Sequence, residues 1–202
     1  MITRLKARRV FALILGLGAF GVIVAVVVHG AFYAPEAEVA IPGLVATTEI
    51  PAQARSIPKR IIIPKIGVDA KVQDVGIGKT GNMAVPSNYS DVGWYRYGPT
   101  PGERGSAVID GHVNNGFGLD AVFKNLNTLK AGDDIYIENA SGTKMHFIVE
   151  HVTESLAKNI SPPEVFALND KARLNLITCA GAWSAQKMQY DSRVIAYAVL
   201  AP

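Results

Sequence analysis

The stretch Leu174-Asn175-Leu176-Ile177-Thr178-Cys179 is an apolar run that ends in the only cysteine of the 202-residue chain. A short apolar run of this kind predicts a strand. A second run, Val108-Ile109-Asp110-Gly111-His112, ends in a histidine, and a third run begins at Arg193 and continues as Val194-Ile195-Ala196-Tyr197. The three runs therefore predict strands that carry a thiol, an imidazole and a guanidinium at their edges.

These three side chains are the candidates for a catalytic site. A thiol is mostly protonated at neutral pH, so a nucleophilic cysteine needs a neighbouring base or cation. Cys179 is the candidate nucleophile, His112 the proton-transfer partner and Arg193 the stabiliser of an anion. For each residue taken alone a structural interpretation stays open: a buried core thiol, a surface histidine and a solvated arginine. The order of histidine before cysteine disfavours a papain-like protease.

The rest of the domain is predicted to consist of short strands separated by Gly, Pro, Asn and Asp clusters. One helix is predicted at residues 119–126, which is too short to cover a parallel sheet. Many short strands with few helices indicate a closed barrel or a sandwich. His29, His146 and His151 are interpreted as structural. The candidate strands are residues 60–68, 71–77, 83–86, 106–112, 134–138, 144–152, 173–179 and 193–200.

Charge is concentrated at the N-terminus. The formal net charge is +3, and the first nine residues hold four cations and no acid, so a nucleic-acid-binding surface is not expected. Residues 10–28 are uncharged and close to the length that crosses a bilayer as a helix. Basic residues on the N-terminal side place that end in the cytoplasm. The four cations are Arg4, Lys6, Arg8 and Arg9.

This pattern predicts four segments: a cytoplasmic basic tail at 1–9, a transmembrane anchor at 10–29, an extended linker at 30–57 and an exported domain at 58–202. A cleaved secretory signal is the competing interpretation, and it exports the same domain. One cysteine cannot form an internal disulfide, so the domain is expected to be stabilised by its core alone.

Together the motifs resemble those of sortases. Asn175-Leu176-Ile177-Thr178-Cys179 resembles their T-L-x-T-C signature, Gly111-His112 their strand-end histidine, and Arg193-Val194-Ile195-Ala196-Tyr197 the start of their last strand. Leu129-Lys130-Ala131-Gly132-Asp133 resembles a turn that precedes a strand in this family. The resemblance covers about Pro58 to Leu200.

Three details refine the resemblance. The segment from Gly93-Trp94-Tyr95-Arg96 to Pro101-Gly102-Glu103 is similar to sortases of class F. Asn175 replaces the first threonine of the signature. Asp110 stands where a small residue is common before Gly-His, and it either adds a negative charge near the site or points into solvent.

The resemblance implies an all-β fold: a closed eight-stranded sortase-type β-barrel with one or two short helices, preceded by a single N-terminal transmembrane helix. It implies a cysteine transpeptidase that cleaves a Thr-Gly bond in an LPxTG-like sorting signal and transfers the acyl group to an amine of the cell wall or of another surface protein. His112, Cys179 and Arg193 are then catalytic and Thr178 contacts the substrate. No cofactor and no metal are expected, and the domain is expected to lie outside the cell membrane.

Two other functions remain open. An L,D-transpeptidase also uses an exported cysteine after a histidine, but its Ser-x-Gly before the cysteine and its arginine close after it are absent around Cys179. A non-catalytic, membrane-anchored β-domain that binds a surface ligand would use Cys179 as a core residue. Under the enzyme hypothesis, specificity is expected in the loops at residues 153–167 and 180–192.

Overall fold

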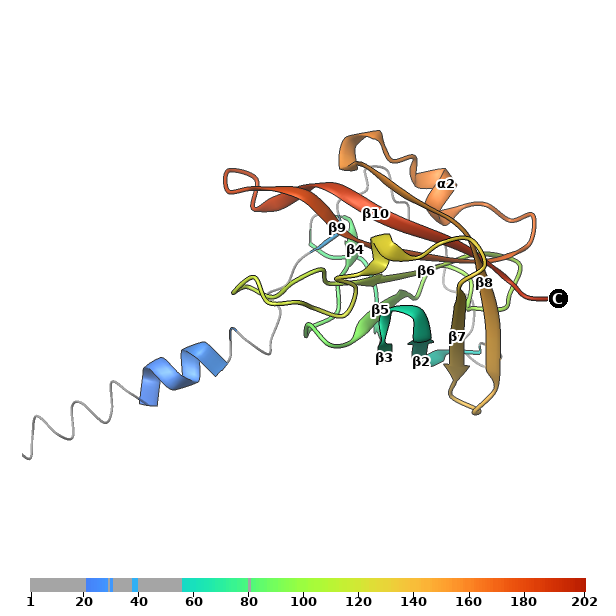
Figure 1. Cartoon of the computed structure of the whole chain (residues 1–202), viewed down its shortest axis with the longest axis horizontal. Coiled ribbons are helices and arrows are strands. Elements are labelled where there is room, and N and C mark those ends of the chain that lie inside the picture. The colour runs from blue at the N-terminus through green and yellow to red at the C-terminus, as the bar shows by residue number, and fades with distance from the viewer. Residues whose placement is uncertain (1–20, 29, 31–37, 40–55, 80) are drawn as a thin grey trace, which may run out of the picture.

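The domain is a closed eight-stranded β-barrel in the computed structural model, which describes residues 21–28, 30, 38–39, 56–79 and 81–202 (Figure 1). The order of strands around the barrel is β10-β8-β7-β2-β3-β5-β6-β9. The pairs β3–β5 and β6–β9 are parallel and the other pairs are antiparallel. The predicted closed eight-stranded barrel is therefore confirmed.

The strands of the barrel differ in length, and the longest lie next to one another. β9 and β10 form a long hairpin that β8 continues on one side and β6 on the other. The barrel strands are β2 (Pro58–Ile63), β3 (Val68–Val75), β5 (Val92–Tyr95), β6 (Gly105–Gly111), β7 (Asp134–Asn139), β8 (Lys144–Leu156), β9 (Ala172–Ser184) and β10 (Gln189–Leu200). A separate two-stranded sheet pairs β1 (Glu38–Val39) with β4 (Met83–Ala84).

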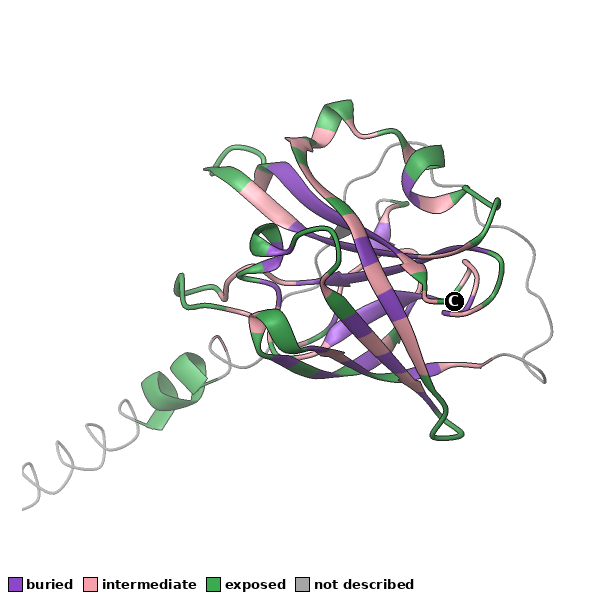
Figure 2. Ribbon diagram, turned by 45° about the vertical axis from the view of Figure 1, so that its right-hand side comes forward, coloured by how far each residue is buried: buried purple, intermediate pink, exposed green. Residues whose placement is uncertain are grey.

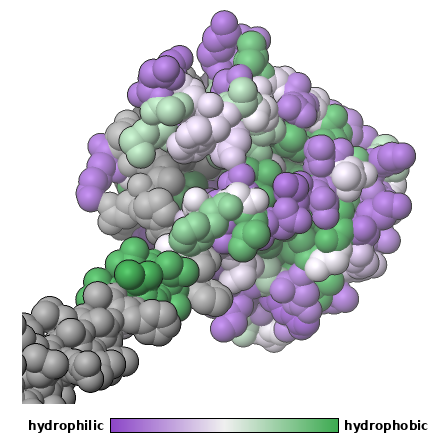
Figure 3. Space-filling model, turned by 60° about the vertical axis from the view of Figure 1, so that its left-hand side comes forward, coloured by the Kyte–Doolittle hydropathy of each residue, from purple (hydrophilic) through white to green (hydrophobic). Residues whose placement is uncertain are grey.

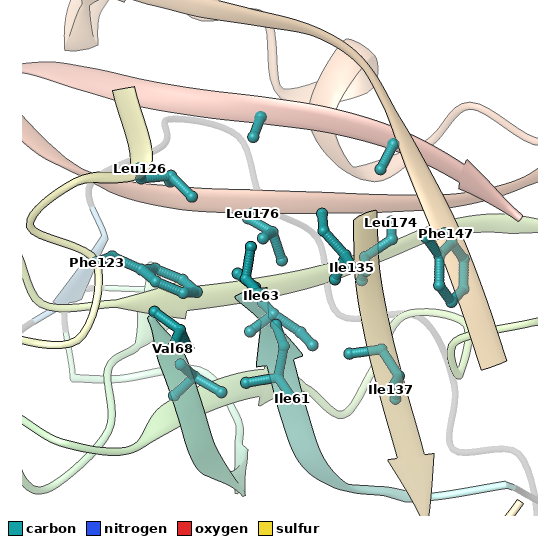
Figure 4. Close-up of a cluster of buried hydrophobic side chains, with 14 of the residues drawn as sticks. Ile61, Ile63, Val68, Phe123, Leu126, Ile135, Ile137, Phe147, Leu174 and Leu176 are labelled. Atoms are coloured by element: carbon teal, nitrogen blue, oxygen red, sulfur yellow. The ribbon is translucent and has the colours of Figure 1, made fainter. Parts of the chain in front are cut away.

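Alternating apolar side chains fill the inside of the barrel. Successive residues of a strand point to opposite faces, so every second residue of a strand enters the core. The alternation appears as bands of buried and exposed residues along single strands (Figure 2). The interior cluster in Figure 4 includes Ile61 and Ile63 from β2, Ile135 and Ile137 from β7, and Leu174 and Leu176 from β9. Burying each of these side chains contributes about 1.5–3 kcal/mol.

A second apolar cluster lies on the outer face of β6, β9 and β10. It contains Val108, Ile177 and Ile195, one from each strand, and Val165 of the short helix α2 (Pro162–Phe166) covers it. These three strands are therefore buried on both faces, which explains why they read as continuous apolar runs rather than as alternating ones.

The predicted helix at 119–126 is wrong, and the predicted strand at 83–86 is confirmed only in part. Residues 119–126 form turns that lead into a 3-10 helix, η3 (Leu126–Thr128), because Phe123 and Leu126 plug one end of the barrel from a compact loop. The predicted strand at 83–86 contributes β4, which lies outside the barrel. Its place is taken by β5, whose four residues are all buried and show no alternation that would predict a strand.

The loops are also shorter than predicted. β8 extends to Leu156, which takes in the first four residues of the predicted loop at 153–167. β9 extends to Ser184 and β10 begins at Gln189, so most of the predicted loop at 180–192 belongs to strands. Two further 3-10 turns complete the fold, η2 (Pro64–Ile66) and η4 (Ala157–Asn159).

The N-terminal predictions fall mostly outside the described residues. The tail at 1–9, His29, most of the linker and the first half of the expected anchor are not described. Residues 21–28 are helical and exposed, and their hydrophobic side chains form the green cluster beside the grey atoms in Figure 3. Within the described part of the chain, no helix is both long enough and apolar enough to cross a membrane.

The two faces of β2 allow a test of the barrel core. Ile61 is fully buried inside the barrel, whereas its neighbour Ile62 faces outward and is only partly buried. We expect Ile61→Ala to lower the free energy of unfolding by about 2–5 kcal/mol, because it removes buried methyl groups and leaves a cavity. Ile62→Ala is the matched control and should cost less than half as much. Urea unfolding measures both, and equal losses would contradict the assignment of the inner face.

Candidate active site

The ends of β6, β9 and β10 bring the three predicted catalytic residues together. The antiparallel register of β9 and β10 places Arg193 directly opposite Cys179. The parallel register of β6 and β9 pairs Asp110 with Ile177. Continued by two residues, this register places His112 at the level of Cys179. The strand that carries the thiol therefore lies between the strand that leads to the imidazole and the strand that carries the guanidinium.

All three residues belong to the outer face of the barrel. Leu176 and Val194 belong to the interior cluster, whereas Ile177 and Ile195 belong to the outer cluster. Because side chains alternate along a strand, Cys179 and Arg193 share the outer face with Ile177 and Ile195. By the same alternation His112 shares this face with Val108. The apolar outer cluster thus continues directly into the group of polar residues.

The imidazole of His112 is held by the loop that follows β4. Its Nε2 lies 3.1 Å from the carbonyl oxygen of Pro86, and its ring centroid lies 5.0 Å from that of Tyr89. A carbonyl oxygen can only accept a hydrogen bond, so Nε2 carries the proton and Nδ1 is left as the free base. Burial lowers the pKa of His112 despite this hydrogen bond, so the neutral imidazole is favoured.

Cys179 is partly buried and has no disulfide partner. Burial raises the pKa of its thiol, the positive charge of Arg193 opposes this shift, and the carboxyl group of Asp110 adds to it. The direction of the shifts at Cys179 and His112 favours an uncharged pair, thiol and imidazole, over thiolate and imidazolium.

Arg193 is a buried cation without a carboxylate partner among the described residues. Only 2 % of the residue is exposed, and Nη1 donates to the carbonyl oxygens of Tyr190 at 2.9 Å and Ser192 at 2.8 Å. Its Nε has no hydrogen-bond partner among the residues that the structure describes. Burying a cation and leaving a donor unpaired both cost free energy, so Arg193 is a candidate functional residue on physical grounds. Nε is a free donor on the side chain opposite Cys179.

Asp110 is buried rather than pointing into solvent. It is 2 % exposed, its Oδ1 has no partner, and burial holds the pKa of its carboxyl group well above the usual range. The carboxyl group lies over Gly93 of β5, where a Cβ would come within 2.5 Å of Oδ1. Glycine at position 93 is therefore needed to make room for Asp110.

Thr178 occupies the inner side of the same strand end. Its hydroxyl donates to the carbonyl oxygen of Gly111 at 2.7 Å, and the residue is 4 % exposed. In this structure Thr178 ties β9 to β6 just before His112, and it does not present a free donor. The other two described histidines have partners of their own: His146 contacts Asp134 at 2.7 Å, and His151 stacks on Tyr197.

A pocket of about 240 Å³ opens beside Cys179 at the mouth of the barrel. It contacts the residues that directly follow His112 and Arg193, so all three strand ends contribute to it. Lys124 in its wall is paired with Asp120 at 3.1 Å, whereas Glu154 makes no ion pair within the described part of the chain. The lining residues are Val113, Phe123, Lys124, Asn127, Glu154, Thr178, Cys179, Ala180, Gly181 and Val194.

Comparison with known proteins identifies the family. A family model described as the sortase domain matches residues 61–201, which is most of the chain. The chain belongs to the sortase family. Membership of this family supports cysteine transpeptidase activity in general terms. A comparison with curated protein sequences found no significant match.

Solved sortase structures share the fold of this sortase at low sequence identity. Sortase C-1 from Actinomyces oris is 22% identical with a TM-score of 0.53, over 71% of this chain and 73% of that chain. The Pilus Island 1 sortase C2 of Group B Streptococcus is 22% identical with a TM-score of 0.54, over 71% and 73%. Sortase A from Corynebacterium diphtheriae is 21% identical with a TM-score of 0.55, over 75% and 63%.

Several residues around the site were not predicted from the sequence. Pro86 and Tyr89 hold His112, and Asn114 and Tyr190 form a 2.6 Å hydrogen bond beside it. Tyr190 stands three residues before Arg193, and Asn114 two residues after His112, so their nearness to the two motifs is the signal that could have found them. Within the described residues, no group of three or more His, Cys, Asp and Glu side chains is arranged to hold a metal ion.

Asp110 gives the stability of this sortase a defined pH dependence. Because its pKa is raised in the folded state, the folded protein holds this proton when the unfolded chain has lost it. The contribution of Asp110 to stability is therefore fully present below about pH 4 and is lost as pH rises toward the folded-state pKa.

We expect Asp110→Asn to remove this pH-dependent loss of stability. The free energy of unfolding of the variant should therefore rise relative to that of the wild type as pH rises above about 4. Urea unfolding at a series of pH values measures the difference. A constant difference across the series would show that Asp110 does not titrate in this way.

Gly181 is required by the backbone beside Cys179. It has a φ of +79°, and a Cβ there would lie 2.6 Å from Ser192 Oγ and would collide with the carboxylate of Asp191. We expect Gly181→Ala to disrupt the β9–β10 bulge, to lower the melting temperature and to reduce the reactivity of Cys179. Gly142→Ala is the matched control, since it also has a positive φ, at +80°, but has open space around it. If both variants lose the same stability, backbone strain alone accounts for the effect.

Proposed function

We propose that this sortase is a membrane-anchored transpeptidase that cleaves a Thr-Gly bond in an LPxTG-like sorting signal. The observation that carries the proposal is the convergence of Cys179, His112 and Arg193 on one face of the barrel, with a free donor on a buried guanidinium. Such a donor can stabilise a negative charge that develops next to the thiol during the reaction.

In the first half of the reaction Cys179 attacks the threonine carbonyl. The sulfur forms a bond to the carbonyl carbon while the thiol proton passes to Nδ1 of His112. Arg193 donates from Nε to the oxyanion, an interaction worth about 2.7–4 kcal/mol for one donor. The imidazolium then protonates the glycine amine as the C–N bond breaks, which leaves a thioacyl enzyme.

In the second half an amine releases the acyl group. His112 accepts a proton from the amine as its nitrogen attacks the thioester carbonyl, and the thiolate that leaves is reprotonated by the imidazolium. The pocket beside Cys179 is the proposed approach for this amine, and Glu154 offers a carboxylate to its ammonium form. Water replaces the amine in a slow hydrolytic side reaction.

The cellular setting is part of the proposal. The basic tail and the apolar segment at 10–28 support a retained anchor with the N-terminus in the cytoplasm and the barrel outside. The partners would be secreted proteins with a C-terminal sorting signal and an amine acceptor of peptidoglycan or of a pilin. Assignment to class F remains a prediction from the segment around Trp94 and Gly102.

The test is intact-mass spectrometry of the full chain in detergent, incubated with a pool of Leu-x-x-Thr-Gly peptides and no amine. We expect a mass increase that matches a peptide truncated after threonine. The adduct should be absent in Cys179→Ala and should form about 10²–10³-fold more slowly in Arg193→Ala, since one oxyanion donor is lost. Circular dichroism should show that both variants stay folded.

The alternative function gives a different result. A non-catalytic binding domain would form no adduct with any peptide, and its Cys179 would resist a polar alkylating reagent in the folded state. An adduct that persists in Cys179→Ala would instead show that the nucleophile has been assigned to the wrong residue.

A further inference from the structure

Tyr190 contacts both sides of the site through separate groups. Its hydroxyl oxygen accepts a hydrogen bond from Asn114 Nδ2 at 2.6 Å, and its carbonyl oxygen accepts one from Arg193 Nη1 at 2.9 Å. Its ring packs against Trp183 across the hairpin, with centroids 5.2 Å apart at 68°. One residue therefore links the loop after His112 to the side chain of Arg193.

Asn114 lies in a loop whose backbone is tied down around His112. Phe123 N donates to the His112 carbonyl oxygen at 2.9 Å, and Ala121 N donates to that of Val113 at 3.2 Å. Asn114 itself forms an isolated bridge with Asp120. A displacement of the Asn114 side chain is therefore expected to move the backbone of His112, two residues earlier in the chain.

The hairpin end of the contact is equally constrained. The register of β9 and β10 shifts between Tyr190 and Ser192, so that Gly181 and Ala182 of β9 form a bulge opposite Asp191. The Asp191 carboxylate accepts hydrogen bonds from Ala182 N at 3.0 Å and from Ser192 Oγ at 2.9 Å. Next to this bulge the Tyr190 carbonyl oxygen accepts from Arg193 Nη1 and the Tyr190 hydroxyl accepts from Asn114 Nδ2.

No other hydrogen bond or ion pair among the described residues joins the 112–125 loop to residues 181–193. The two segments flank Cys179, and they carry the imidazole and the guanidinium. The strand ladders set the register of Cys179 and Arg193, and this one side-chain hydrogen bond adds a direct tie between the loop after His112 and the hairpin.

We propose that the Asn114–Tyr190 hydrogen bond is a latch that positions His112 and Arg193 on either side of Cys179. Asn114 and Tyr190 are positioning residues, since they act through His112 and Arg193. The roles of those two residues rest on the proposed function. The latch ties the loop after β6 to the β9–β10 hairpin.

Removing one partner tests the latch. Tyr190→Phe keeps the ring and the carbonyl group and removes only the hydroxyl, and Asn114→Ala removes the donor. We expect each variant to lower kcat for peptide turnover about tenfold with little change in KM, because small displacements of catalytic groups are costly. The double variant should be no slower than either single variant, because both remove the same contact.

Two control variants separate positioning from general damage. Asn114→Asp should retain activity, because the Tyr190 hydroxyl then donates to the carboxylate. Tyr136→Phe removes a tyrosine hydroxyl on β7, far along the barrel from the site, and should behave as wild type. Melting temperatures should be unchanged in all of these variants if the latch acts on the site alone.

A second readout does not require the peptide substrate. The rate of Cys179 alkylation by iodoacetamide as a function of pH reports the thiolate, which the charge of Arg193 stabilises. Without the latch the hairpin that carries Arg193 is held less closely to the loop after His112, so its charge should stabilise the thiolate less. The midpoint should therefore move to higher pH in Tyr190→Phe and Asn114→Ala but not in Asn114→Asp.

The outcomes separate the two proposals. If the wild type forms no thioacyl adduct, the proposed function fails, and the alkylation profile still decides the latch. If the adduct forms but both variants keep the wild-type kcat and alkylation profile, the latch is overturned. Losses that multiply in the double variant, or that follow a lower melting temperature, overturn it as well.

Discussion

The position of β9 between β6 and β10 is the constraint on which the rest of this structure depends. Its parallel register with β6 and its antiparallel register with β10 bring three distant parts of the chain to one level. The hydrogen bond from Thr178 to Gly111 holds the β6 side at its last residue, and the backbone ladder holds the β10 side. Moving β9 by one residue would turn Cys179 to the opposite face of the sheet.

The burial of unpaired polar groups at this site costs free energy, and the apolar core of the barrel offsets that cost. Arg193 is a buried cation with an unpaired Nε, and Asp110 is a buried carboxyl group with an unpaired Oδ1. Within the described part of the chain neither group has an ion-pair partner, and each lies beside Cys179 on the outer face. The apolar interior and the outer cluster below the site supply burial that offsets these costs. Buried polar groups that lack partners and cluster in one place are typical of functional sites.

The electrostatics of the site favour a resting state in which neither Cys179 nor His112 is charged. Burial shifts the pKa of Cys179 upward and that of His112 downward, so each shift opposes an ion pair. In the proposed reaction the proton therefore moves as the sulfur attacks. The carbonyl of Pro86 matters for this step, because it fixes the proton on Nε2 and leaves Nδ1 free. Loop geometry thus sets the protonation pattern that the chemistry uses.

The sequence by itself determined the type of fold and the identity of the chemically distinctive residues. Apolar runs bounded by turn residues predict strands, and an isolated cysteine after such a run stands out in composition. Only the tertiary structure decided the role of β5, which has no alternation because both of its faces are buried. The same holds for residues 119–126, of which Phe123 and Leu126 are fully buried in the barrel core. The Asn114–Tyr190 contact was likewise decided by tertiary structure. Strand periodicity is a local property of the chain, whereas which side chains meet across a barrel depends on register between segments far apart in sequence.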